Sequence, residues 1–190
     1  MEKQGFGSHS TAELIRSGSM AGKMAIGSRW EWEHWRDGKL LSTWVEPNIM
    51  TDEGITYIMD AALSGASPIT SFYIEVFEND YTPLSTNTYA VPGFTACTAY
   101  AEATRPAWTE AGIAAKIITN SASKATFTFN DTKTIYGGAL VGGGSAASTK
   151  ADAAGGGKLI CSSQFTTGSK SVVSTDVLKV TVTITGSNVT

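Results

Sequence analysis

The feature of this sequence that most limits its fold is a succession of short strand-like segments with a single helical segment before them. These segments alternate in polarity or are rich in β-branched and aromatic residues, and read "SFYIEVF", "TACTAYA", "AKIITN", "KATFTFN", "TIYGGALV", "KLICSSQF" and "DVLKVTVTITG". A parallel sheet would need a helix after nearly every strand. The sequence therefore predicts a mainly β protein, an antiparallel β-sandwich or jelly roll with one short α-helix.

A β-hairpin is predicted over residues 29–46, with Asp37 and Gly38 supplying the positive φ angles of a two-residue turn. Side chains alternate along a strand, so pairing Arg36 with Lys39 assigns every side chain to a face. One predicted face carries Trp30, Trp32, His34, Leu41, Thr43 and Val45. The other carries Glu31, Glu33, Trp35, Leu40, Ser42 and Trp44.

Four of the five tryptophans lie in this hairpin and are candidates for a protein interface, where tryptophan is enriched. Trp30 and Trp32 are also expected to contribute to the core, because they share a face with aliphatic residues. Trp35 and Trp44 lie on the second predicted face. There they are expected to contact another protein chain, with a carbohydrate platform as the alternative.

Residues 1–28 are rich in Gly, Ser and Ala and are predicted to form an extended N-terminal arm, followed by one domain over residues 29–190. The patterned piece "TAELIRSG" is too short to hold a helix alone. The apolar arm residues Phe6, Leu14 and Ile15 need a surface to pack on, which makes them further interface candidates. A Gly/Ala/Ser loop is predicted at about residues 142–157.

The single predicted helix spans residues 51–64. Thr51 is the expected N-cap, two acidic residues occupy the first turn, and Gly65 follows the end. Apolar residues recur at helical spacing and are expected to pack on the body of the protein. They are Ile55, Ile58, Met59, Ala62 and Leu63.

The composition disfavours several classes of partner. The net charge is −3 and Lys and Arg are scattered, so a nucleic-acid partner is not expected. No apolar run has the length of a membrane helix and no secretory signal is recognisable, which predicts a protein made in a cytoplasm without a membrane partner. Cys97 and Cys161 are expected to be buried free thiols, although a disulfide is possible if their strands are neighbours.

No catalytic, metal or cofactor site is predicted. Glu31 and Glu33 have the spacing of an inverting glycosidase pair, but a hairpin edge does not place them on both sides of a bond. The two histidines, His9 and His34, have no nucleophile motif around them. An ion pair between Glu102 and Arg105 is expected to be structural. The sequence thus favours a protein that is not an enzyme.

Several segments together resemble a family of small structural proteins from tailed bacteriophages. They are "NIMTDEGITYIMDAAL", "SFYIEVFENDYTP", "AYAEATRPAW" and "ITNSASKATFTFNDTKTIYGGAL". The resemblance implies a capsid decoration or cement protein on the virion surface, bound to the major capsid protein, with a β-sandwich or jelly-roll body. It brings no catalytic residues. A dimer or trimer is expected, since closed symmetric oligomers are common.

Two other functions stay open. A tail-associated or fibre-base protein fits the same resemblance. A host-glycan-binding module, using Trp35 and Trp44 as its platform, belongs to a different class.

Overall fold

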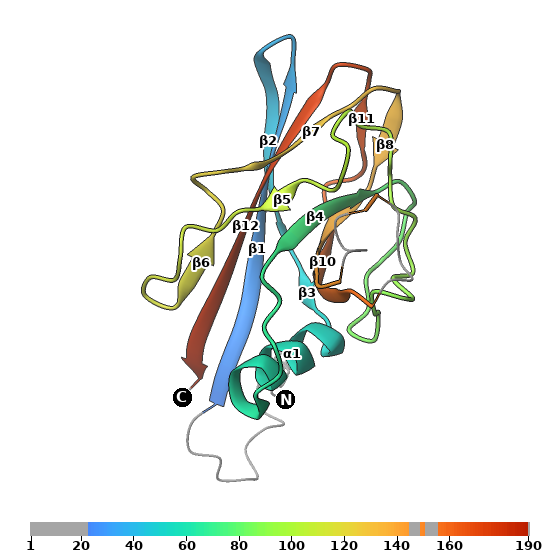
Figure 1. The fold of residues 1–190 in the computed structure, drawn as a ribbon. Helices are drawn as coiled ribbons and strands as arrows, with labels where there is room; N and C mark the ends of the chain where they lie inside the picture. Colours follow the sequence, from blue (N-terminus) through green and yellow to red (C-terminus); the bar gives the residue numbers. More distant parts are fainter. Residues whose placement is uncertain (1–22, 145–148, 151–155, 190) are drawn as a thin grey trace, which may run out of the picture.

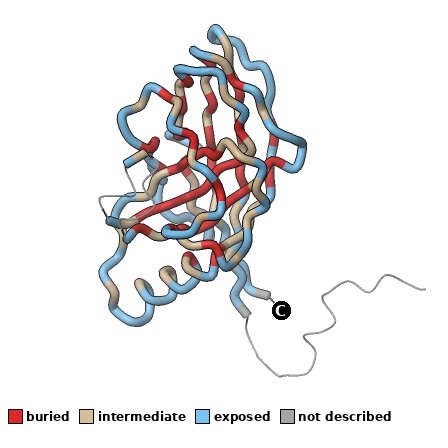
Figure 2. The backbone as a smooth tube through the Cα atoms, turned by 90° about the vertical axis from the view of Figure 1, so that its right-hand side faces the viewer, coloured by how far each residue is buried: buried red, intermediate tan, exposed pale blue. Residues whose placement is uncertain are grey.

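The computed structural model describes residues 23–144, 149–150 and 156–189, and Figure 1 shows their arrangement. The fold is mainly β, with antiparallel sheets packed together and one helix at the lower end of the molecule. The predicted sandwich-like class is therefore confirmed. Buried backbone runs through the middle of the body, whereas the helix and the loops are mostly half-buried or exposed (Figure 2).

The first sheet is built on a long ladder between β1 and β12, paired from Lys23 with Val189 to Trp35 with Val177. Its strands are β1 (Lys23–Arg36), β2 (Lys39–Pro47), β12 (Val177–Val189), β6 (Ile117–Thr119) and β7 (Ala125–Thr128). The strand order is β2-β1-β12-β6, and β7 also pairs with β12. Because β1 begins at Lys23, the predicted arm boundary at residue 28 is wrong: residues 23–28 pair with the end of β12.

The second sheet lies against the first and has the order β3-β10-β9-β4-β5. Its strands are β3 (Ile49–Met50), β4 (Phe72–Phe77), β5 (Ala107–Trp108), β9 (Gly137–Gly142) and β10 (Lys158–Gln164). A separate pair joins β8 (Lys133–Ile135) to β11 (Lys170–Val172). The expected strand at residues 95–101 is reduced to isolated bridges at Ala96 and Tyr100.

The β1–β2 hairpin contains a β-bulge that reverses the predicted faces of β2. Asp37 and Gly38 have φ angles of 49° and 73°, as the turn requires. The register then shifts, with His34 opposite Ser42 but Trp35 opposite Leu40, so Leu41 is the extra residue. Beyond the bulge every β2 side chain points to the opposite face from the one predicted.

The core between the sheets is centred on tryptophans. Trp32 stacks between Trp30 and Trp44 at ring-centroid distances of 5.7 and 6.1 Å, and Phe165 meets Trp32 edge-on at 4.9 Å. Gly138 on β9 makes room for them, because a Cβ there would lie 2.7 Å from the Trp32 ring. The glycine-rich "GGALVG" strand therefore holds a bulky aromatic layer against the opposite sheet.

The helix α1 (Asp52–Met59) continues into a π-helical turn, Asp60–Ser64, and ends at Gly65 with a φ of 80°. The predicted cap is confirmed, since the Gly54 N–H donates to Thr51 Oγ1 at 2.9 Å. A Cβ on Gly54 would lie 2.3 Å from the carbonyl oxygen of Ile160. The first turn of α1 is thus pressed against the backbone of β10.

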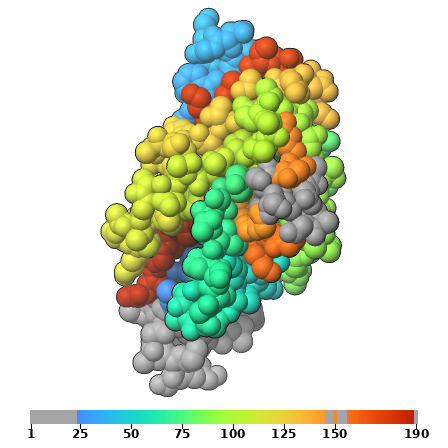
Figure 3. Space-filling view, in the orientation of Figure 1, coloured from blue at the N-terminus to red at the C-terminus, as the bar shows by residue number. Residues whose placement is uncertain are grey.

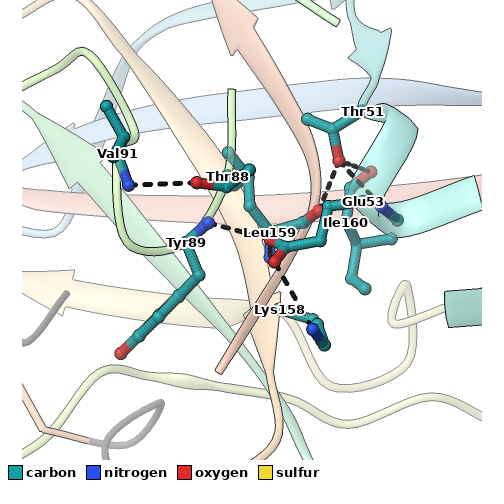
Figure 4. A network of polar contacts seen from close by, with 9 residues as sticks. Thr51, Glu53, Thr88, Tyr89, Val91, Lys158, Leu159 and Ile160 are labelled. Atoms are coloured by element: carbon teal, nitrogen blue, oxygen red, sulfur yellow. Dashed lines mark hydrogen bonds and ion pairs between the residues drawn. The ribbon is translucent and has the colours of Figure 1, made fainter. Parts of the chain in front are cut away.

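Polar contacts fix that first turn in place (Figure 4). The Thr51 N–H donates to the carbonyl of Ile160 at 3.1 Å. The Glu53 carboxylate accepts the backbone N–H groups of Tyr89 and Leu159, each at 2.8 Å, and pairs with Lys158 at 3.5 Å. These bonds set the rotation of α1 about its own axis, and so decide which side chains it exposes.

Candidate protein interface

The helix exposes most of the apolar residues that were expected to pack inward. Ile55, Met59 and Leu63 are 39, 53 and 80% exposed, and Ala62 is exposed beside them. The inward side carries the buried Gly54 and the half-buried Tyr57 and Ile58 of α1, followed by the half-buried Ala61 of the π-helical turn. Of the predicted stripe, only Ile58 packs inward. We call Ile55, Met59 and Leu63 the helix face.

The inward side is determined by contacts that are distant in sequence. Tyr57 packs edge-on against Phe72 at 6.2 Å, and its hydroxyl accepts the N–H of Ile69 at 2.7 Å. Gly54 lies against β10 three residues earlier on the same side. Gly54 and Tyr57 therefore lie on the inward side together with Ile58, and the helix face is left exposed to water.

Three of the four hairpin tryptophans are unavailable to a partner. Trp30, Trp32 and Trp44 are 0, 1 and 8% exposed and belong to the core. The prediction that Trp44 lies on the second, outer face is wrong, because the bulge turns its side chain inward, opposite Trp32. The same shift leaves Leu41 and Val45 on the outer face, where each is about half exposed.

Trp35 lies half-buried on the outer face of the hairpin and already has neighbours. Its indole N–H donates to Glu33 Oε2 at 2.9 Å, and the Lys179 ammonium lies 4.7 Å from its ring centroid. Glu33 also pairs with Lys124, which lowers the pKa of its carboxyl group. A lowered pKa is the opposite of what a catalytic acid needs.

Trp35 lies on the outer face of the hairpin, whereas Trp44 lies on the inner face. The two rings therefore form no shared platform for a carbohydrate.

A buried polar cluster closes the far end of the hairpin. Asp176 accepts hydrogen bonds from Arg36 Nε at 2.7 Å and from the Val173 N–H at 2.9 Å, and lies 2.8 Å from His34 Nε2. The Arg36 guanidinium and these hydrogen bonds hold the pKa of Asp176 well below its ordinary range. The cluster ties β1 to the start of β12, which is a structural role.

Another buried ion pair joins Arg105 to Glu75 at 2.8 Å. The expected partner, Glu102, instead accepts the Thr128 N–H at 3.1 Å. Arg105 also donates a hydrogen bond to the Tyr89 hydroxyl at 3.0 Å. The guanidinium of Arg105 thus binds both the Glu75 carboxylate and the Tyr89 hydroxyl. Burial raises the pKa of Glu75, and Arg105 opposes that rise.

The cysteines are free and buried, as expected. Burial raises the pKa of both the Cys97 and Cys161 thiols to about 11, so neither is an activated nucleophile. Among the described residues, no three His, Cys, Asp or Glu side chains gather where they could hold a metal ion. Nor does any helix in the described ranges have the length and hydropathy to cross a membrane.

Some predicted site residues cannot be placed. Phe6, Leu14, Ile15 and His9 lie outside the described residues, as does much of the predicted loop at 142–157.

Comparisons with protein-family models, with curated proteins and with solved structures each found no match. Among the described residues, the exposed apolar side chains of the helix face form the candidate protein interface, which the sequence pattern had placed in the core.

Proposed function

We propose that this chain is a non-enzymatic structural protein of a tailed-bacteriophage virion, and that it decorates the capsid by binding the major capsid protein. The observation that carries the proposal is the helix face. A short helix anchored by its first turn presents Ile55, Met59 and Leu63 to water, and such a surface is typical of protein contact sites. The resemblance seen in the sequence supplies the virion as the setting.

The chemistry of the interior supports a role through contact. The buried carboxylates of Asp176, Glu75 and Glu46 are all bonded to neighbouring groups: Glu46, for example, accepts the Thr166 N–H at 2.9 Å. Buried charges that are paired and hydrogen-bonded in this way are typical of structural ion pairs inside a fold. The apolar surface, rather than a reactive group, is then the functional feature.

Self-association through the edge of the first sheet is part of the proposal. β2 ends that sheet among the described strands, and Leu40, Leu41 and Val45 along it are each about half exposed. An edge strand with exposed apolar side chains is suited to pairing with a second copy. A symmetric dimer made in this way would leave the helix face free for the capsid.

The test mixes purified protein with capsid shells that lack it, and measures co-sedimentation and the survival of the shells on heating. The full chain is expected to bind and to raise the temperature at which shells break. A Met59→Glu/Leu63→Glu variant is expected to lose at least tenfold in affinity. Thr56→Glu, a charge on the neighbouring polar side of the helix, is the matched control and should bind normally.

Other outcomes point elsewhere. Failure of the full chain to bind shells would contradict the decoration role. Binding to isolated tails instead would favour the tail-associated alternative. Equal binding by the parent and the double variant would remove the helix face from the interface.

A further inference from the structure

An apolar groove of about 420 Å³ opens between α1, the first residues of β1 and the last residues of β12. In Figure 3 it is the hollow between the helix and the ends of β6 and β12, with β1 at its back. The walls are mostly aliphatic and aromatic. They include Met24, Ile58, Phe72, Ile113, Ile118 and Ile184.

The groove has a buried apolar floor and the volume of a binding site. Its floor is fully buried, formed in part by Leu140, Ile160 and Trp108. The Trp108 indole N–H is satisfied by the carbonyl of Val182 at 3.1 Å, so the ring offers an apolar surface. The volume lies within the range of about 300 to 1,000 Å³ typical of binding sites.

The rim carries the most exposed apolar side chains of the groove. Met24 and Ile113 are 70 and 75% exposed, although both face an apolar cavity. Lys116 is the one charged residue of the lining. An occupant with adjacent aliphatic side chains and a nearby carboxylate would match this arrangement of apolar walls and a cationic rim.

The chain itself brings such a segment to the rim. β1 begins at Lys23, and its second residue, Met24, already lines the groove. The preceding residues 17–22 read "SGSMAG", and six residues can span at most about 20 Å. Before them, residues 11–16 read "TAELIR", with Leu14 and Ile15 next to Glu13.

We propose that the groove binds residues 11–16 of the same chain, with Leu14 and Ile15 between its walls and Glu13 facing Lys116. The short tether makes the effective concentration of the segment millimolar in order of magnitude, so modest apolar contact suffices for occupancy. The proposal concerns the free protein and does not rest on capsid binding.

The direct test places a photoreactive benzoylphenylalanine at Leu14 in the full chain, followed by irradiation and mass-spectrometric mapping. Adducts are expected within single chains, on residues 113–118 and 184–187. The same probe at Phe6, outside the proposed segment, should give few adducts there. Adducts between two chains would overturn the proposal in favour of a second copy, and adducts elsewhere would overturn the groove as the docking site.

A second measurement uses the dye 1-anilinonaphthalene-8-sulfonate, which brightens in apolar sites. Leu14→Asp/Ile15→Asp in the full chain should empty the groove and raise dye fluorescence several-fold over the parent. Phe6→Asp is the matched control and should resemble the parent. Equal fluorescence in the double variant and the parent would contradict the proposal. Neither measurement involves shells, so its result is independent of the decoration role.

Discussion

The β1–β2 hairpin and the helix α1 treat their apolar residues in opposite ways. The hairpin turns three tryptophans inward, whereas α1 turns an aliphatic stripe outward. In each case one feature sets the direction: the bulge at Leu41 in the hairpin, and the close approach of Gly54 to Ile160, which is distant in sequence, in the helix. Hydrophobicity alone therefore does not tell which apolar face of an element is buried.

The largest expected effect comes from the inward side of the hairpin. Trp32→Ala should lower the free energy of unfolding by about 3 to 5 kcal/mol, because it leaves a cavity between two stacked rings. Trp35→Ala on the outer face should cost about 1 kcal/mol, mainly through its cation–π contact. Urea unfolding measures both. Equal losses would mean that the two faces are not distinct.

Asp176→Asn should cost about 3 kcal/mol at neutral pH, since it removes the anion that binds Arg36 and His34 at the end of the hairpin. The pKa of Asp176 is lowered in the folded protein from its ordinary value of about 3.9. Its stabilisation is therefore fully present above that value and is lost as the pH falls toward the folded pKa.

The difference between parent and variant should accordingly shrink below pH 4, as measured by urea unfolding over a pH series. A difference that stays constant down to pH 2 would show that Asp176 stabilises the fold by packing rather than by charge.

The anchor of the helix is the next test. Thr51→Ala should lower the free energy of unfolding by about 1 kcal/mol, because the Gly54 N–H loses its acceptor. Thr51→Ser keeps the hydroxyl and should lose less than half as much. Thermal unfolding of the two variants gives the comparison. An equally stable alanine variant would show that the cap does not hold α1.

The smallest effect is expected on the helix face. Met59→Glu and Leu63→Glu should each change the free energy of unfolding by no more than about 0.5 kcal/mol, as for exposed positions. A loss of 2 kcal/mol or more in chemical unfolding would place the stripe in the core. That result would restore the packing expected from the sequence.

Local chemistry was readable from the sequence. The turn at Asp37 and Gly38, the Thr51 cap and the antiparallel class each depend on a few neighbouring residues, and each is confirmed. The alternation of β12 was equally clear, and Leu178, Val180 and Val182 are buried as one face.

Features that depend on distant partners were not readable. Nothing near Leu41 signals a bulge, because the burial of Trp44 against Phe165 selects it, and Phe165 lies on a remote segment. Arg105 pairs with Glu75 rather than with its near neighbour Glu102 for the same reason. The one available hint for α1 was Gly54, whose missing side chain permits the close contact that rotates the helix.

We propose that the helix face, and not the tryptophan hairpin, meets the capsid. Met59 is a built-in reporter, because an exposed methionine is readily oxidised. Hydroxyl-radical footprinting of the full chain, free and bound to shells, should show oxidation of Met59 falling several-fold on binding, while Trp35 changes little. Unchanged oxidation of Met59 in the bound state, with protection of Trp35 instead, would place the hairpin rather than the helix face against the capsid.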